Sequence, residues 1–580
     1  MTGSPSDGSG PVRIESLRLT AEEIAFRARA DRRLMNWPVV YTLEGGREVY
    51  VGESRHVATR LRQHLDSRER GHLVRARVIL DDTFNKSACL DLESYLIRLL
   101  SGDGERIVLN RNDGVVDSDY FDRARYQATF DRIFDDLLQQ GLFTRPVRDI
   151  ENSDLFKLSP FKALTNDQEA AVESILEGFF EDRAQQVPSR TVVQGEPGTG
   201  KTVLAIYLLK LLMDIRDADP EEPVDGDSRF ADFFTPDHPE RVAGLRVGFV
   251  VPQQSLRASV RQVFARTPGL SADMVLSPFD VGASEQRFGL LVVDEAHRLS
   301  QRANQPSGVL NRKFADINRR LFGEDAAELT QLDWIQDRSD HQILMLDPLQ
   351  TVRPADLPAR VVVPLVAEAR SQGRLHTLRS QLRVAAGDDY LGFVRSLLGD
   401  EPVAPRAFPG YDLRLFDDLS VMRAELARRE AESGLARLVA GYAWAWASKN
   451  DPTAVDIELD GVGLQWNSTA VDWVHSARAV DEVGSIHTVQ GYDLNYAGVI
   501  IGRDLAWDDS AQRVRFQREH YFDKKGRENN PTLGITYTDE DLLAYVRNIY
   551  AVLLTRGILG TYVYVCDPGL RRRFAHTLAT

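Results

Sequence analysis

The residues with the clearest chemical meaning form a glycine-rich run in the middle of the 580-residue chain. Glycines in such a loop let backbone N–H groups close around a polyphosphate, and the start of a following helix adds partial positive charge. A lysine at its end reaches the outer phosphates, and a threonine hydroxyl helps to hold Mg²⁺. The pattern predicts an ATP site made by Gly195, Glu196, Pro197, Gly198, Thr199, Gly200, Lys201 and Thr202.

Two flanking segments must position this loop. The apolar run 191–193 indicates a buried strand, and the apolar run 203–209 indicates a packed helix. Strand, glycine-rich loop and helix, in that order, are the context that distinguishes a phosphate-binding loop from a chance glycine turn.

A pair of acidic residues follows a second apolar run, 290–293. Asp294 and Glu295 stand at the carboxyl end of this predicted strand, the edge at which an α/β sheet binds its nucleotide. We expect Asp294 to reach Mg²⁺ through water. We expect Glu295 to polarise the water that attacks the terminal phosphate.

Five more polar residues stand at or near the ends of predicted elements, in the runs 164–171, 343–350, 380–383, 485–493 and 548–557. With the loop and the acid pair, they resemble the motifs of superfamily 1 helicases in the order that superfamily uses. The resemblance covers about residues 161–580. It departs from the superfamily pattern at Leu346, where the third motif has glycine.

The resemblance implies a role for each of these side chains. Gln168 would read the adenine edge, and Gln350 would sense the γ-phosphate. Arg383 would reach across to ATP, and Gln490 would lie near the nucleotide. Arg556 would act as an arginine finger.

A second group of residues near the N-terminus could cut a phosphodiester. A hairpin is predicted from two short strands around a Gly-Gly pair, and two helices follow it. A carboxylate can hold a divalent metal, an arginine can neutralise developing charge, and a tyrosine or histidine can move a proton. The group consists of Tyr41, Tyr50, Arg60, His64, Glu93 and Asn110.

These six residues resemble the GIY-YIG nuclease domain over about residues 35–115. The first motif stands as Val39-Val40-Tyr41 and keeps only the tyrosine, whereas the second stands as Tyr50-Val51-Gly52. The resemblance implies that Glu93 holds Mg²⁺ or Mn²⁺ and that Arg60 contacts the phosphate. Which of Tyr41, Tyr50 and His64 is the base stays open.

The fold class that follows is α/β, with a small α+β GIY-YIG domain before two RecA-like parallel-sheet lobes. The combination resembles a bacterial family of superfamily 1-like proteins, long labelled a domain of unknown function, and implies defence against phage. The expected parts are a leader with an N-terminal helix (1–34), the nuclease-like domain (35–118), a helical linker (119–160), lobe 1 (161–365) and lobe 2 (366–580).

An aromatic stretch in lobe 2, 442–446, is expected at the end of a helix over about 421–448. Its rings could stack bases, but aromatic residues at this density are more often part of a core.

Bulk properties limit the cellular setting. The net charge is −15, which neither predicts nor excludes a nucleic-acid binder, because local grooves matter more than the sum. No apolar run is long enough for a membrane span. The N-terminus lacks an apolar signal, and Cys89 and Cys566 form no disulfide framework, so a cytoplasmic location is expected.

The sequence therefore predicts an ATP-dependent helicase or translocase coupled to a metal-dependent endonuclease acting on nucleic acid, with DNA favoured by the family. A second copy of the chain or a defence-system protein are further expected partners. One alternative is a nucleotide-gated regulatory protein whose N-terminal domain binds nucleic acid without cutting. Another is an RNA-directed nuclease-helicase.

Overall fold

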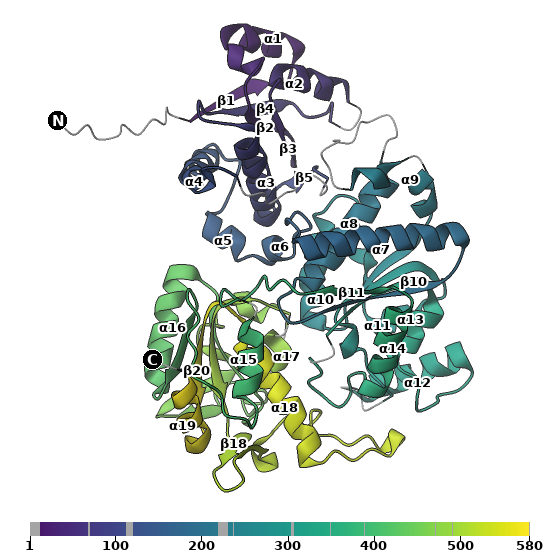
Figure 1. Ribbon diagram of the computed structural model, residues 1–580, viewed down its shortest axis with the longest axis vertical. Coiled ribbons are helices and arrows are strands. Elements are labelled where there is room, and N and C mark those ends of the chain that lie inside the picture. The colour runs from purple at the N-terminus through teal and green to yellow at the C-terminus, as the bar shows by residue number, and fades with distance from the viewer. Residues whose placement is uncertain are drawn as a thin grey trace, which may run out of the picture. The chain divides into compact units, whose positions relative to one another are not determined.

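The computed structural model (Figure 1) divides into two compact units. The first comprises residues 1–165, 206–243 and 262–272, and the second comprises 166–205, 244–261 and 273–580. The structure describes residues 12–67, 70–111, 120–218, 230–235, 237–302, 305, 307–347, 350–387, 389–469, 471–489 and 491–578. Most of the expected leader, residues 1–11, lies outside the described residues.

The first unit is built on a five-stranded sheet that is antiparallel except for the pairing of its last two strands. Its order is β1 (Arg13–Arg18), β4 (Arg75–Leu80), β2 (Val39–Gly45), β3 (Glu48–Ser54) and β5 (Ile107–Val108). The predicted hairpin is β2 and β3. Its helices include α1 (Ala21–Ala30), α2 (Val57–Asp66) and α3 (Lys86–Asp103).

The N-terminal helix expected within residues 1–34 is present as α1, but it is shorter than expected and a strand precedes it. Residues 13–18 form an edge strand paired with β4, and the chain then turns into α1 and a short 3₁₀ helix, Arg32–Leu34. Leu17 is buried in this pairing. The partner strand lies about sixty residues further along the chain, so local periodicity did not reveal it.

The segment expected to be a linker, 119–160, belongs to the core of the first unit. Helix α4 (Arg123–Gln139) buries Phe130, Ile133 and Phe134 in the same cluster as residues of α3. The short helices α5 (Val147–Glu151) and α6 (Asp154–Lys157) follow.

The second unit contains two sheets that are parallel, as the sequence predicted, except for the antiparallel pairing of the last strand of the second sheet. The first sheet has the order β11 (Leu375–Leu378), β6 (Ser189–Gly195), β10 (Ser339–Leu346), β9 (Phe288–Val293), β7 (Val247–Val250) and β8 (Val275–Leu276). Strand β11 pairs with β6, so the first lobe extends past the expected boundary at residue 365. The helices that precede or follow these strands include α7 (Asn166–Gln185), α8 (Lys201–Arg216), α10 (Gln254–Ala265), α11 (Pro278–Ala283), α12 (Gly308–Phe322), α13 (Gln331–Arg338) and α14 (Ala359–Ser371).

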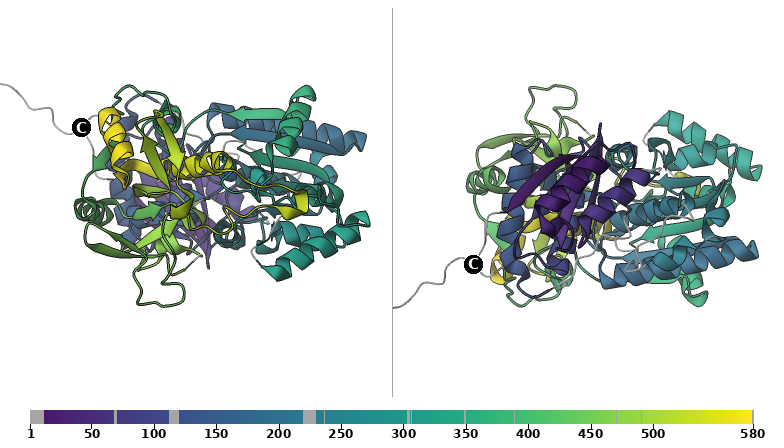
Figure 2. Two further views of the ribbon diagram at one scale, coloured as in Figure 1. Left: turned by 90° about the horizontal axis from the view of Figure 1, so that it is seen from below. Right: turned by 90° about the horizontal axis from the view of Figure 1, so that it is seen from above.

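The second sheet has helices on both faces (Figures 1 and 2). Neighbours in β17 lie in different hydrophobic clusters: Val499 faces the cluster of α18, and Ile500 faces that of α16. The order is β12 (Asp412–Phe416), β20 (Gly557–Val565), β17 (Leu494–Ile501), β13 (Ala436–Ala440), β16 (Glu482–Ser485), β15 (Val462–Trp466) and β14 (Ile457–Leu459). Its helices are α15 (Asp389–Leu397), α16 (Leu419–Ser433), α17 (Ile486–Val489), α18 (Asp539–Leu554) and α19 (Pro568–Thr577).

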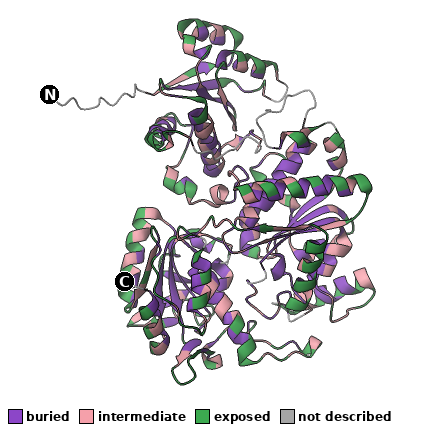
Figure 3. Cartoon of the chain, viewed as in Figure 1, coloured by how far each residue is buried: buried purple, intermediate pink, exposed green. Residues whose placement is uncertain are grey.

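Burial follows this layered arrangement, since the strands are buried and the outer helix faces are exposed (Figure 3). The two parallel-sheet lobes are RecA-like, and the predicted α/β class is confirmed. A small antiparallel pair, β18 (Leu505–Asp508) and β19 (Arg513–Phe516), lies between β17 and α18 in the chain. Among the described helices, none combines the length and apolar character that a membrane crossing requires.

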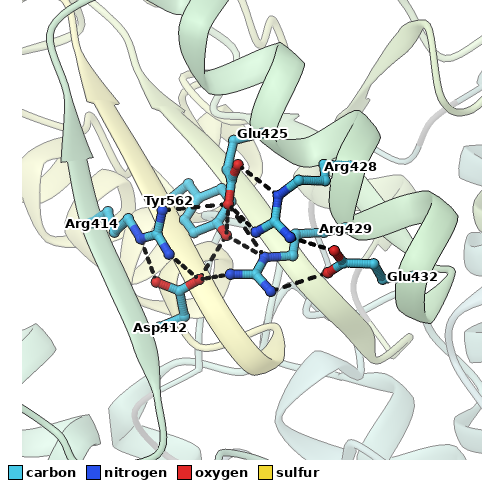
Figure 4. Close-up of polar contacts among 7 residues, drawn as sticks. All are labelled: Asp412, Arg414, Glu425, Arg428, Arg429, Glu432 and Tyr562. Carbon is cyan, nitrogen blue, oxygen red and sulfur yellow. Dashed lines mark hydrogen bonds and ion pairs between the residues drawn. The ribbon is translucent and has the colours of Figure 1, made fainter.

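A polar network ties α16 to the edge of the second sheet (Figure 4). Arg429 donates to Asp412 at 2.7 Å and to the Tyr562 hydroxyl at 2.9 Å. The same hydroxyl donates to Asp412 at 2.7 Å. These contacts join the helix to the edge strand β12 and to its neighbour β20, so the network fixes the position of α16.

Candidate active sites

The phosphate loop has the flanking elements that the sequence predicted. Strand β6 ends at Gly195, and helix α8 begins at Lys201. The Lys201 ammonium donates to the carbonyls of Gly195, at 2.7 Å, and Glu196, at 3.0 Å. Gly198 has a φ of 88°, a left-handed conformation that glycine adopts without strain. The lysine therefore closes the loop on itself and must exchange these carbonyls for phosphate oxygens when a nucleotide binds.

Thr202 and Asp294 meet directly. The Thr202 hydroxyl donates to Asp294 Oδ2 at 2.8 Å, and Asp294 is fully buried. Burial, followed by the neighbouring Glu295 charge, raises the pKa of Asp294 to about 7. Asp294 Oδ1 has no hydrogen-bond partner among the described residues. A buried carboxylate oxygen beside a hydroxyl is a donor set that suits Mg²⁺.

Glu295 is held in an unusual conformation at the end of β9. Its φ is 45°, and its carboxylate lies 3.1 Å from His297 Nε2. Burial alone would raise its pKa, but His297, Lys201 and two arginines outweigh burial and lower it. Glu295 is therefore ionised near neutral pH and can accept a hydrogen bond from water.

One arginine of the second lobe, Arg556, acts on Glu295, and a second, Arg383, acts on Arg556. Arg556 is 2% exposed and donates to the Tyr492 carbonyl at 3.1 Å. Burial, followed by the Arg383 charge, lowers its pKa to about 9, and Glu295 opposes this shift. Arg383 forms an ion pair with Asp493. The structure thus brings the two predicted arginines together and places Arg556 near Glu295.

Two of the three predicted glutamines lie at the nucleotide site. Gln350 donates to Asp347 at 2.6 Å, and the Asp347 amide donates to His297 at 3.3 Å, so Gln350 is linked to the acid-pair strand. Gln168 is buried and donates to the Thr199 carbonyl at 2.9 Å, on the phosphate loop. Gln490 lies outside the described residues.

Two contacts on the loop were not predicted. Gln381 donates to the Pro197 carbonyl at 2.8 Å, and Arg395 lies 2.6 Å from Glu196. Gln381 lies two residues before Arg383, in a run that resembles a helicase motif, so the sequence could have indicated a contact with the nucleotide site. Arg395 lies on an apolar helix, where no pattern marked it.

The N-terminal group also converges in space. The Tyr41 hydroxyl and His64 Nε2 are 2.8 Å apart, and the Tyr50 ring centre lies 5.1 Å from that of His64. Gly52, opposite Tyr41 in the hairpin, permits this arrangement, because a Cβ there would lie 2.5 Å from the Tyr41 hydroxyl. The two strands and α2 therefore bring two phenols and an imidazole together.

Charged groups surround this trio. Burial raises the pKa of Tyr41 well above its usual value; the charges of Tyr50 and Glu93 act in the same direction, and Arg60 opposes them. Burial also raises the pKa of Tyr50. The charges of Arg60 and Glu93 act on both tyrosines, which is the neighbourhood expected of a phosphate contact and a metal ligand.

His64 is neutral near pH 7. Burial, followed by the charges of Arg70 and Arg60, lowers its pKa to about 3. The Arg70 guanidinium lies 4.3 Å from the Tyr50 ring centre. Arg70 was not predicted, since an arginine in a polar run carries no distinguishing signal.

Asn110 binds strand β3, which carries Tyr50. Its amide donates to the Val51 carbonyl at 2.7 Å and accepts from the Val51 amide at 3.0 Å. The side chain thus continues the sheet, which places it as a support for the hairpin.

Comparison with known proteins identifies the larger part of the chain. Residues 188–567 match the family model described as Schlafen group 3, DNA/RNA helicase domain. This match spans more than half of the chain and includes the phosphate loop, the acid pair and both arginines. The chain belongs to this helicase-domain family. The nucleotide site described above therefore lies inside a Schlafen group 3 helicase domain.

One curated relative of this helicase-domain protein is the uncharacterized protein YPL245W of Saccharomyces cerevisiae (strain ATCC 204508 / S288c). It is 25% identical over 415 residues, which cover 67% of this chain and 84% of the relative. Similar solved structures include the Pif1 helicase from Bacteroides in complex with ADP-AlF3 and ssDNA (9% identity) and Bacteroides Pif1 bound to ssDNA (10%). Both cover 69% of this chain and 92% of the solved chain, with a TM-score of 0.25.

Proposed function

We propose that this protein is an ATP-dependent superfamily 1-like helicase or translocase coupled to a metal-dependent GIY-YIG endonuclease. The observation that supports the ATP-dependent motor is the convergence of side chains from both lobes: Lys201, Thr202, Asp294, Glu295 and Arg556. The endonuclease is supported by the cluster of Tyr41, Tyr50 and His64 in the first unit.

In ATP hydrolysis, Lys201 would leave the loop carbonyls for the outer phosphates. Thr202 and Asp294 would hold Mg²⁺, which when bound neutralises charge on the phosphates. The ionised Glu295 would accept a hydrogen bond from water and orient it toward the terminal phosphorus. Arg556 would stabilise the charge that develops on the transferred group.

In strand cleavage, Glu93 would hold Mg²⁺ or Mn²⁺. A site with one carboxylate suits such ions, which commonly keep several waters and bind substrate phosphates. The metal would polarise the phosphate when bound. Arg60 would contact the phosphate, and neutral His64 beside the Tyr41 hydroxyl would provide a path for the proton.

We place DNA as the substrate and the cytoplasm as the location, with defence against phage as the setting. Support for DNA and defence comes from the family resemblance, and support for a reducing compartment comes from the two free cysteines. RNA is the alternative substrate, and a second copy or a defence protein is the proposed partner.

The test is cleavage of labelled single-stranded, duplex and forked DNA and of the matching RNA, with ATP and either Mg²⁺ or Mn²⁺. We expect wild type to cut at least one form and Glu93→Gln to cut none. Glu22→Gln, an exposed glutamate on α1, is the matched control and should cut like wild type. If wild type cuts nothing while hydrolysing ATP, the nuclease proposal fails and the nucleotide-gated regulatory protein replaces it.

A further inference from the structure

The aromatic stretch of lobe 2 is not helical, contrary to the sequence expectation. Helix α16 ends at Ser433, strand β13 follows, and residues 441–446 are irregular. Tyr442, Trp444 and Trp446 alternate with alanines and emerge at the carboxyl end of β13. That end of a parallel sheet is where ligands bind in α/β folds.

The three rings surround a fourth, buried ring. Trp466 is 1% exposed, and its ring centre lies 5.4 Å from Tyr442, 6.4 Å from Trp444 and 6.3 Å from Trp446. Within the described part of the chain, the Trp466 indole N–H has no hydrogen-bond partner. The three outer rings are only half-buried. Each therefore packs on Trp466 and still presents surface to solvent, which a purely structural core would not require.

A further aromatic residue and two lysines lie next to these rings in space or in the chain. Phe522 is 39% exposed, and its amide donates to the Tyr442 carbonyl at 2.8 Å. Lys449 is exposed and lies 5.7 Å from the Trp446 ring centre. Lys524 is exposed two residues beyond Phe522. We name Tyr442, Trp444, Trp446 and Phe522 the aromatic platform.

Nearby acidic groups are already engaged. Asp523 lies 3.0 Å from His487 Nε2, and Asp456 accepts from the Ser448 amide at 2.8 Å. Asp451 accepts from the backbone and hydroxyl of the threonine two residues later. The lysines next to the platform are therefore available to an anionic ligand.

The platform adjoins the run 485–493, one of the segments that resemble superfamily 1 helicase motifs. The His487 ring centre lies 5.5 Å from that of Tyr442, and the His487 carbonyl accepts from Gln253 at 3.4 Å. Gln253 follows β7 in the first lobe. A ligand on the platform would thus lie beside a direct contact between the lobes.

We propose that the aromatic platform stacks the unpaired bases of a single-stranded nucleic acid while Lys449 and Lys524 contact its phosphates. Proteins that bind single strands use exposed aromatic rings together with cations. The rings stack on the bases, and the cations contact the charged phosphates. The bases of an intact duplex are already stacked on one another, so the platform selects single strands. This inference rests on the proposed helicase function and adds the site at which it holds its substrate.

The test measures the binding of fluorescein-labelled oligo(dT), oligo(U) and a blunt duplex of equal length by fluorescence anisotropy. Trp446→Ala and Phe522→Ala should each weaken single-strand binding about 5- to 150-fold, the range found for losing one stacked base. Trp446→Phe should recover most of the affinity, because it keeps a ring. Trp507→Ala is the matched control: its half-buried ring lies outside the platform, on β18, beside Arg573.

The two lysines have a separate signature. Lys449→Ala and Lys524→Ala should each lower the slope of log affinity against log salt by about 0.7, as one lost phosphate contact does on single strands. Comparison of oligo(dT) with oligo(U) assigns the strand as DNA or RNA.

The outcomes separate this inference from the proposed function. If wild type binds single strands and Trp446→Ala binds them equally well, the platform is overturned and the helicase proposal stands. Equal binding of the duplex also overturns it. If wild type binds no single strand, both proposals fail.

Discussion

Arg556 offers the sharpest test of the nucleotide site, because its buried charge should lower the stability of the protein while it raises the rate of ATP hydrolysis. The pKa of its guanidinium is lowered to about 9 by burial and by Arg383. The drop from the usual value corresponds to about 5 kcal/mol against the charged form. A protein that carries such a cost in a fully buried position gains nothing in stability from the charge. We therefore expect Arg556→Met, which keeps the volume, to fold at least as well as wild type.

Two measurements separate the stability of Arg556→Met from its activity. Because the folded protein carries this cost of about 5 kcal/mol, its removal should offset the loss of the hydrogen bond to the Tyr492 carbonyl, so urea denaturation should give an equal or higher free energy of unfolding. Removal of an arginine finger lowers the rate of triphosphate hydrolysis about 10³- to 10⁵-fold. Binding of a fluorescent ATP analogue should change far less than the rate.

Arg437→Met is the matched control for Arg556→Met. Arg437 is also buried, but it pairs with Glu430 at 2.7 Å and donates to the Val474 carbonyl at 2.9 Å. Its loss should reduce stability and leave hydrolysis per folded molecule intact. Hydrolysis by Arg556→Met within tenfold of wild type, or a clear loss of its stability, would refute the reasoning.

Three further outcomes are expected. Thr202→Val removes the hydroxyl that bonds Asp294 and should abolish Mg²⁺-dependent ATP hydrolysis with an unchanged circular dichroism spectrum; full activity would contradict the assigned metal site. Gly52→Ala places a methyl group against the Tyr41 hydroxyl and should abolish strand cleavage while ATP hydrolysis persists, measured on one preparation. Burial raises the pKa of Asp504 to about 7, so the folded form binds a proton that the unfolded form releases near pH 4. The stability of wild type relative to Asp504→Asn should therefore fall by about 4 kcal/mol as pH rises from about 4 to 7, and a flat difference in urea midpoints would refute this.

The parts of the molecule that the sequence predicted correctly are those encoded within short stretches. The loop from Gly195 to Thr202 and the Asp294–Glu295 pair each combine a strand, a turn and polar residues at fixed spacing. Such patterns depend on local backbone geometry, so the flanking strand and helix followed directly. The hairpin around Tyr41 and Tyr50 was predictable for the same reason.

The errors arose where contacts distant in sequence decide the structure. Strand β1 exists because β4 pairs with it, and β11 joins the first sheet because β6 offers its edge. The alanines of the stretch Tyr442–Trp446 favour a helix, yet the stretch follows the buried strand β13 and its rings pack on Trp466. The contact of Arg395 with Glu196 is likewise a product of lobe packing, which no local pattern encodes.

The most direct test of the central claim is steady-state ATP hydrolysis by wild type and Lys201→Ala, each with and without single-stranded DNA or RNA. The account predicts hydrolysis by wild type that rises when a single strand is added, and no hydrolysis by Lys201→Ala under either condition. Wild-type hydrolysis that ignores every nucleic acid, or activity that survives in Lys201→Ala, would contradict it.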